Sequence, residues 1–260
     1  MKLTILTENQ AGAGFLAEHG LSYLIESGGD RILFDTGSSD VFLKNASKLG
    51  FDIQKDIDIV ILSHGHWDHG NGLQYLRNKT LITHPGVFMN RFRKHNQTPI
   101  GLYLSREEIE EYFELLTTQN SYKIANNLIF LGEIPRINDF EAQTTTFIDE
   151  DGNPDFVFDD SAIAVVENNE LIVITGCSHS GICNIVDYAM KVTGLKSVKA
   201  VIGGFHLKYN NKQTQQTIQY FKNLNVKNLY PSHCTELEAL TAFSAVFNIS
   251  ALKTGMILEF

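Results

Sequence analysis

Ser63-His64-Gly65-His66-Trp67-Asp68-His69-Gly70-Asn71-Gly72 is the stretch with the densest metal-binding chemistry in the chain. Three histidines and an aspartate lie between positions 64 and 69. They directly follow Ile57-Asp58-Ile59-Val60-Ile61-Leu62, which has the length and β-branched content of a buried strand. Glycines within and after the cluster permit the sharp turn that the chain makes where such a strand ends. The polar side chains are therefore expected at the carboxyl edge of a sheet.

Four side chains in this stretch, those of His64, His66, Asp68 and His69, offer nitrogen and oxygen ligands to one or two divalent ions. Zinc and other borderline ions prefer this combination of imidazole and carboxylate. Such an ion lowers the pKa of a bound water, which then serves as a nucleophile near neutral pH. Because Asp68 lies between ligands, we also expect it to accept the proton of that water or to hold the nucleophile.

A second strand ends on a carboxylate, in Arg31-Ile32-Leu33-Phe34-Asp35-Thr36-Gly37. Taken alone, Asp35 reads as a turn or helix cap. Beside a histidine cluster, however, a buried carboxylate commonly accepts a hydrogen bond from a metal-binding imidazole and so orients it. The second interpretation is the one that we prefer for Asp35.

Length and composition favour one large domain. The 260 residues are 43% hydrophobic, and no linker or low-complexity segment interrupts them. The formal charge of −9, from 21 basic and 30 acidic residues, argues against a nucleic-acid partner. Cys177, Cys183 and Cys234 form no CxxC pair, which favours reduced thiols in the cytoplasm. No segment approaches the roughly 18 apolar residues of a membrane span, so no membrane partner is expected.

Hydrophobic patterning and turn signals predict alternating strands and helices. We expect strands over 3–8, 22–27, 31–35, 57–62, 80–84, 122–125, 128–134, 156–158, 161–166, 171–175, 198–202, 228–230 and 256–260. We expect helices over 39–49, 72–78, 105–116, 184–193, 213–224 and 236–247. The resulting two strand-rich halves indicate two facing mixed sheets with helices outside.

The segment 85–120 is expected to be a helical, lid-like insertion. Its capping box, Ser105-Arg106-Glu107-Glu108, predicts a helix that runs to about Leu116. Before it, Arg91, Arg93 and Lys94 lie among apolar residues. They are either a solvated helix face or a patch over the site that grips the phosphate or carboxylate of a substrate.

Three later strand ends repeat the pattern of an apolar strand followed by glycine or proline and then histidine. They carry His179, His206 and His233. A single such histidine is more often a satisfied polar side chain, but three of them together with the first cluster indicate one shared edge. Cys177 is either an inert buried thiol or a thiolate ligand. Asp159 and Asp160 are further candidates, although a turn carboxylate is their default role.

With Leu33-Phe34-Asp35-Thr36-Gly37 and the H-x-H-x-D-H motif in this order, the chain resembles the metallo-β-lactamase fold superfamily. The resemblance implies an α/β fold, a four-layer αββα sandwich of two mixed sheets flanked by helices. It also implies a mono- or binuclear metal site at one sheet edge, for which we expect two divalent ions, zinc before iron or manganese. Carried onto matching positions, His64 and His66 bind the first ion, Asp68 and His69 the second, and His233 is the last motif histidine. The superfamily's aspartate after Thr-Gly is replaced here by Cys177, with His179 two residues on, so both are candidate ligands.

Further motifs, among them Glu18-His19-Gly20-Leu21-Ser22 and Gly203-Gly204-Phe205-His206-Leu207, are similar to those of the archaeal dihydropterin-methyl ribofuranosylaminobenzene-phosphate synthases and their bacterial relatives. The leading hypothesis is a metal-dependent hydrolase or transferase for a small, phosphorylated or pterin-like substrate. In it His206 donates to the leaving group or binds substrate, and His19 grips the substrate with the basic patch. The alternatives are a pterin-condensing synthase and a non-catalytic metal- or ligand-binding module.

Overall fold

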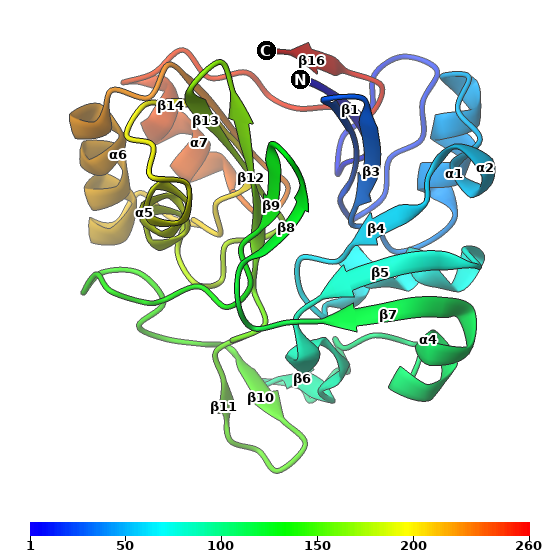
Figure 1. Cartoon of the computed structure of the whole chain (residues 1–260). Helices are drawn as coiled ribbons and strands as arrows, with labels where there is room; N and C mark the ends of the chain where they lie inside the picture. The colour runs from blue at the N-terminus through cyan, green and yellow to red at the C-terminus, as the bar shows by residue number, and fades with distance from the viewer. The chain divides into compact units, whose positions relative to one another are not determined.

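The chain divides into two compact units. A computed structural model describes all 260 residues (Figure 1). Each unit has its own sheet and its own hydrophobic core. The first unit comprises Met1–Gln119, Thr146–Asp155 and Leu252–Phe260, and the second comprises Asn120–Thr145 and Phe156–Ala251.

The first unit contains a mixed seven-stranded sheet. The strands lie in the order β16 (Ile257–Glu259), β1 (Lys2–Thr7), β2 (Ser22–Ser27), β3 (Asp30–Phe34), β4 (Ile59–Ile61), β5 (Lys79–Thr83) and β7 (Phe113–Thr117). Pairing is antiparallel from β16 to β3 and parallel from β3 to β7. The carboxyl ends of β3, β4 and β5 therefore meet at one edge, where ligand sites commonly form in sheets of this kind.

Four short α-helices and a smaller sheet complete the first unit. The helices are α1 (Val41–Lys48), α2 (Ile53–Asp56), α3 (Trp67–Gly70) and α4 (Arg106–Tyr112), with 3₁₀ helices η1 (Asn71–Tyr75) and η2 (Pro85–Phe88). A three-stranded sheet joins β11 (Pro154–Asp155), β10 (Phe147–Asp149) and β6 (Arg91–Arg93). Phe42 and Ala46 of α1 pack with Leu6, Leu24 and Leu33 in the core. This packing fixes the strands whose ends carry the polar residues.

The second unit contains a six-stranded sheet with three helices. The strand order is β15 (Asn228–Ser232), β14 (Val198–Gly204), β13 (Glu170–Thr175), β12 (Ala162–Glu167), β9 (Leu128–Phe130) and β8 (Tyr122–Ala125). Strands β13, β14 and β15 run parallel. The helices α5 (Ile182–Thr193), α6 (Lys212–Leu224) and α7 (Leu237–Ser244) share one core with the strands. No helix in the chain combines the length and apolar character needed to cross a membrane.

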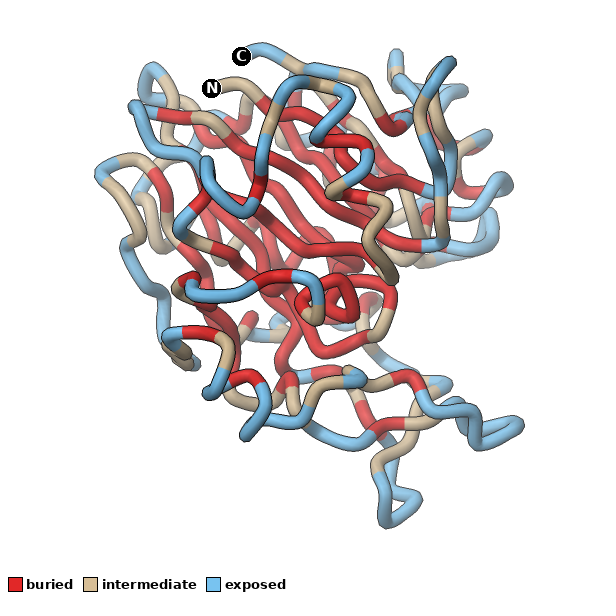
Figure 2. Tube along the Cα trace, turned by 90° about the vertical axis from the view of Figure 1, so that its right-hand side faces the viewer, coloured by how far each residue is buried: buried red, intermediate tan, exposed pale blue.

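The strands are the most deeply buried parts of the chain. Figure 2 shows buried residues running along the strands, whereas exposed residues gather in the loops. Such burial explains the near-continuous apolar runs from which the strands were predicted. The mixed α/β class, with two mixed sheets and accompanying helices, is confirmed.

Several predicted elements are wrong in type or extent. Within 85–120, expected to be helical, the α-helix α4 has 7 residues and ends at Tyr112. The following residues form β7, because Phe113–Thr117 pair with the exposed edge of β5 and bury Phe113 in the core. The segment expected to be a basic helix face instead contains η2 and β6.

Two further elements also differ from their predictions. The expected helix over 72–78 is a 3₁₀ helix over Asn71–Tyr75. The expected strand over 156–158 is irregular, because Arg136 Nη2 takes the carbonyl oxygens of Phe156 and Val157 as acceptors. Val157 has a φ of 55°, a left-handed conformation that ends any regular pairing.

A buried glutamate caps α5 from outside the helix. The residue before the helix, Gly181, has a φ of 96° and offers no side-chain cap. Instead, Glu141 accepts hydrogen bonds from the backbone N–H groups of Cys183 and Asn184 at 2.9 and 3.0 Å. A Cβ at position 181 would lie 2.4 Å from Glu141 Oε2, so only glycine leaves room for the carboxylate. Glu141 thus fixes the helix that follows the loop carrying Cys177 and His179.

Replacement of Glu141 by alanine is expected to lower the free energy of unfolding by about 2 kcal/mol, because two buried N–H groups lose their acceptor. Urea denaturation of the purified variant measures this change. The matched control is Glu111→Ala, which removes an exposed glutamate from α4. Equal stability of the two variants would show that the cap contributes nothing.

Candidate functional site

In the first unit, the predicted cluster follows β4 as a compact, buried group. His64 and His69 are fully buried, and His66 and Asp68 retain 6% and 7% exposure. Nε2 of His64 lies 3.0 Å from Nδ1 of His66, and Nε2 of His69 lies 3.9 Å from Oδ2 of Asp68. Three imidazoles and one carboxylate therefore converge inside the protein, as the motif predicted.

Asp35 holds this cluster in place from the end of β3. Its Oδ1 accepts a hydrogen bond from the Ser63 N–H at 2.7 Å, and its Oδ2 accepts one from Ser63 Oγ at 2.7 Å. Oδ2 also lies 2.7 Å from Nδ1 of His69. Because a carboxylate favours a proton on the nitrogen that faces it, Nε2 of His69 is left as the nitrogen that can bind a metal. This is the geometry expected of an orienting aspartate.

The electrostatic environment keeps His64 neutral. Burial, followed by the nearby His69 and His66, holds the pKa of His64 well below its ordinary value. Ser63 Oγ lies 2.9 Å from its Nδ1. A neutral imidazole is the form that binds a metal ion, so the surroundings prepare His64 for that role. A set of buried, neutral nitrogen donors with a carboxylate fits a zinc-like ion.

Glycine is required inside the motif because another backbone segment passes over it. A Cβ at Gly65 would lie 2.0 Å from the carbonyl oxygen of Val87. A Cβ at Gly72 would lie 2.2 Å from the carbonyl oxygen of Thr36. The backbone of the motif is therefore in close contact with η2 at Gly65 and with the loop after β3 at Gly72.

His19, a predicted substrate-binding residue, lies directly beside the cluster. Its Nε2 is 3.2 Å from Oδ2 of Asp68, and its side chain is 54% exposed. Its ring also lies near that of Trp67, with a centroid distance of 5.6 Å. His19 therefore connects the buried carboxylate of Asp68 to solvent.

The three predicted basic residues do not form one patch. Arg91 is fully buried, and its Nε lies 3.3 Å from Oδ2 of Asp155. Its Nη2 donates to the carbonyl oxygen of Gly86 at 3.2 Å. Arg93 and Lys94 are exposed. The Arg91 guanidinium thus ties η2 to β11, and Arg93 and Lys94 are the members of the trio that can meet a ligand from solvent.

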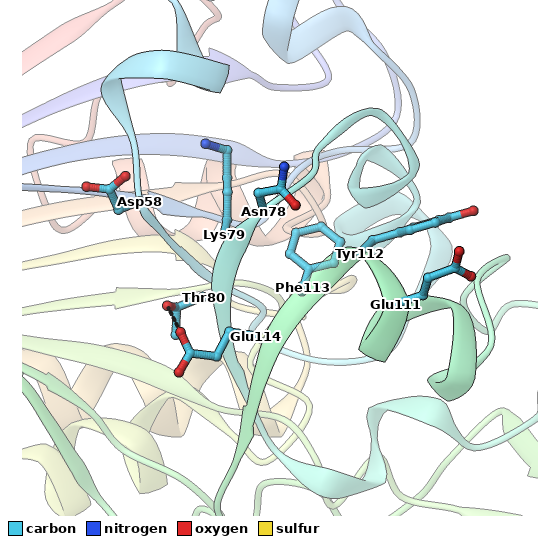
Figure 3. Close-up of a pocket in the computed structure, with 8 residues that line it drawn as sticks. All are labelled: Asp58, Asn78, Lys79, Thr80, Glu111, Tyr112, Phe113 and Glu114. Atoms are coloured by element: carbon cyan, nitrogen blue, oxygen red, sulfur yellow. Dashed lines mark hydrogen bonds between the residues drawn. The ribbon is translucent and has the colours of Figure 1, made fainter.

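A different hollow of the first unit lies at the opposite edge of its sheet, where β5 and β7 begin (Figure 3). Thr80 Oγ1 donates to Glu114 Oε2 at 3.2 Å, and Lys79 Nζ donates to the carbonyl oxygens of Gln54 and Ile57. No histidine or cysteine lines this hollow, so it lacks the imidazole and thiolate ligands of the two clusters. Its lining residues are Asp58, Asn78, Lys79, Thr80, Glu111, Tyr112, Phe113 and Glu114.

In the second unit, the ends of three adjacent parallel strands gather a second cluster. Cys177 and His179 follow β13, His206 follows β14, and His233 follows β15. Cys177 and His179 are almost fully buried, at 4% and 9% exposure. The rings of His179 and His206 lie 4.3 Å apart between centroids. Hence the later histidines meet at one edge of their own sheet, as predicted from the strand ends.

Cys234 belongs to this second cluster, although it was not among the predicted site residues. One ligand atom each from Cys177, His206 and Cys234 lies within 4.8 Å of the others. Burial raises the pKa of the Cys234 thiol, but its hydrogen bond to Cys177 and the neighbouring His206 outweigh burial and hold that pKa well below its ordinary value. The position of Cys234 in the sequence could have indicated this role, since Cys234 directly follows His233 at a strand end.

Asp160 supports the loop that carries His179. Its Oδ2 accepts hydrogen bonds from the Ser180 N–H at 2.9 Å and from Ser180 Oγ. Burial raises the pKa of Asp160 to about 6. Its Oδ1 is buried and has no hydrogen-bond partner. Asp160 therefore acts on the site through the backbone next to His179.

The sequence profile of the metallo-beta-lactamase superfamily matches residues 17–189. An uncharacterized protein of Methanocaldococcus jannaschii is 34% identical over 266 residues, covering 98% of this chain and 99% of that protein. The 7,8-dihydropterin-6-methyl-4-(beta-D-ribofuranosyl)-aminobenzene-5'-phosphate synthase of the same organism is 34% identical over 286 residues, covering 100% and 97%. A crystal structure of a metal-dependent hydrolase of the beta-lactamase superfamily is similar at a TM-score of 0.89 and 32% identity, covering 100% and 99%. These similarities run through both units.

Replacement of Asp35 by asparagine is expected to weaken zinc binding by about 10- to 100-fold. The asparagine NH₂ donates to Nδ1 of His69, so the ring proton moves to Nε2 and removes that nitrogen as a ligand. Competition of the metal-free variant with a chromophoric chelator measures the affinity. Asp40→Asn, at the start of α1 and paired with Lys44, is the control and keeps wild-type affinity. Unchanged affinity in Asp35→Asn contradicts the orienting role.

Proposed function

Because the chain belongs to the metallo-beta-lactamase superfamily, we propose that it is a metal-dependent hydrolase or transferase for a small, phosphorylated or pterin-like substrate. The sequence profile and the likeness to a superfamily hydrolase confirm the predicted fold class. Relatives that match over the whole chain include both a hydrolase and a synthase. Whether this chain hydrolyses its substrate or transfers a group is therefore the part that we propose.

The observation that carries the proposal is the buried cluster in which Asp35 orients His69 beside His64, His66 and Asp68. Burial of several polar donors is costly unless they serve a ligand or a hydrogen-bond network. We propose two divalent ions, zinc before iron or manganese, as that ligand. The proposed metal ligands are His64, His66, Asp68, His69, Cys177, His179 and His233.

When bound, zinc supplies a Lewis acid that lowers the pKa of water and polarises a phosphoryl or carbonyl oxygen. Asp68 accepts the proton of the attacking group. His19, 3.2 Å from Asp68 and half-exposed, passes that proton to solvent. His206 donates a proton to the leaving group. The proposed catalytic residues are thus Asp68 and His206, with His19 as an outlet for the proton.

The substrate class rests on charge and on the synthase relative. The name of that relative contains a dihydropterin and a ribofuranosyl-aminobenzene phosphate; both parts are small, and the phosphate is anionic. In this chain, His19, Arg93 and Lys94 are exposed and carry or can carry positive charge, which suits a phosphate. The net charge of −9 favours such a molecule over a nucleic acid. Three free thiols support a cytoplasmic location.

A pterin-condensing synthase is the second candidate, favoured by 34% identity to the synthase over the whole chain. In that reaction the pterin diphosphate loses pyrophosphate as it joins the aminobenzene ribophosphate. A non-catalytic module that binds metal or ligand is the candidate of another class. It predicts tight ligand retention without any product, and the intact cluster with its orienting Asp35 argues against it.

The double variant His64→Ala/Asp68→Ala is expected to lose the metal held by the first unit's cluster and all hydrolysis of generic phosphoesters, because it removes one proposed ligand of each ion. Elemental analysis and a phosphoester assay measure the two losses. His95→Ala/Asp151→Ala, which alters an exposed histidine and an exposed aspartate, keeps both metal and activity. Hydrolysis that survives complete removal of metal would refute the proposal.

Incubation with a pterin diphosphate and an aminobenzene ribophosphate is expected to distinguish hydrolase from synthase. A hydrolase cleaves the diphosphate with water and yields no coupled product, whereas a synthase yields the coupled product with one pyrophosphate for each. Mass spectrometry of the products separates the two outcomes. The binding-module hypothesis requires that both substrates be recovered unchanged.

A further inference from the structure

We infer that Cys177, His206 and Cys234 form a thiolate-rich site for a zinc-like ion. This inference rests on the proposed metal dependence and deepens it, because it assigns Cys177 to a sulfur site together with Cys234 and makes His206 a metal ligand in place of a proton donor. All three residues belong to the second unit. Their ligand atoms, two sulfurs and one imidazole nitrogen, lie within 4.8 Å of one another.

Strand register brings the three residues together. In the parallel pair β14 and β15, Gly203 and Gly204 lie opposite Pro231 and Ser232. Strand β13 runs parallel to β14 on its other side, with Ile174 opposite Ile202. Each of the three strands therefore ends at the same edge of the sheet. The cluster follows from the topology and not from one flexible loop.

The backbone around the cluster is shaped to let the two sulfurs approach. A Cβ at Gly204 would lie 2.5 Å from Cys234 Sγ and 3.3 Å from the Cα of Cys177. Glycine at this position thus leaves the space that Cys234 Sγ occupies. Cys234 Sγ also donates to the carbonyl oxygen of Cys177 at 3.4 Å. His206 has a φ of 51°, a left-handed conformation that residues with a Cβ adopt at some cost.

One atom in the cluster lacks the partner that its burial calls for. Nδ1 of His206 is buried and has no hydrogen-bond partner. A buried polar atom without a partner destabilises the fold. A metal ion bound at this nitrogen would remove that deficit. The orphaned nitrogen shows that the ring of His206 has a buried donor site that no protein group uses, in the residue whose ring lies beside the two sulfurs.

The donor set selects the class of metal. Two thiolates and one imidazole match the Cys₂His zinc sites that keep a fourth position open for water or substrate. Soft sulfur ligands disfavour magnesium, calcium and manganese, which bind through oxygen. Cys183, the third cysteine, lies in α5 beside Glu141 and is not part of the cluster. It provides a control with the same chemistry at another buried position.

Cobalt(II) substitution tests the site directly, because thiolate ligands give cobalt a near-ultraviolet charge-transfer band that histidine and aspartate do not. The wild-type chain loaded with cobalt is expected to show this band. Cys234→Ser and Cys177→Ser are each expected to lose about half of it, and Cys177→Ser/Cys234→Ser all of it. Cys183→Ser keeps the full band. Circular dichroism of each metal-free variant must match wild type, and Cys234→Ala replaces Cys234→Ser if that variant fails to fold.

The outcomes separate this inference from the proposed function. Cobalt that binds and supports hydrolysis without a charge-transfer band overturns the sulfur site and leaves the proposed function standing. A charge-transfer band in a wild-type chain that neither hydrolyses a phosphoester nor couples a pterin supports the sulfur site while the proposed function fails. A band lost in Cys183→Ser, or a Cys177–Cys234 disulfide in protein purified with zinc and reductant, also overturns the inference.

Discussion

A single buried carboxylate sets the geometry of the first unit's cluster. Asp35 has no exposure to solvent and a φ of 55°, so it is held both electrostatically and conformationally. Its oxygens bind the backbone and hydroxyl of Ser63 and the ring of His69, which joins the end of β3 to the segment after β4. A buried carboxylate is stable only when hydrogen-bond donors surround it, so Asp35 and its donors on Ser63 and His69 hold one another in place. The protein itself therefore positions the histidines that follow β4.

Both units bring polar side chains together by the same arrangement of strands. In each, three adjacent parallel strands end together, and polar side chains follow directly after the strand ends. Parallel pairing aligns the strand ends, so ligands far apart in sequence become neighbours without long flexible loops. Rigid placement of this kind favours recognition and catalysis, because little conformational entropy is lost when a ligand binds.

The parts of this arrangement that the sequence predicted are those encoded locally. The histidine motif, the apolar strands and the glycine turns each lie within about ten residues, and pattern alone identifies them. The predictions that failed concern residues whose structure depends on partners far away in the sequence. Phe113–Thr117 forms a strand only because β5 offers an unpaired edge, and Arg91 is buried only because Asp155 meets it from a segment more than sixty residues away. Cys234 is likewise recognisable only once β13 and β15 are known to flank β14.

The close approach of Val87 to Gly65 ties two parts of the chain mechanically. The carbonyl oxygen of Val87 occupies the space that any side chain at 65 would need, between the first two motif histidines. A displacement of η2 would therefore press directly on the backbone between His64 and His66. The Arg91 contacts with Asp155 and Gly86, which anchor η2, thus help to set the spacing of two histidines in another part of the chain.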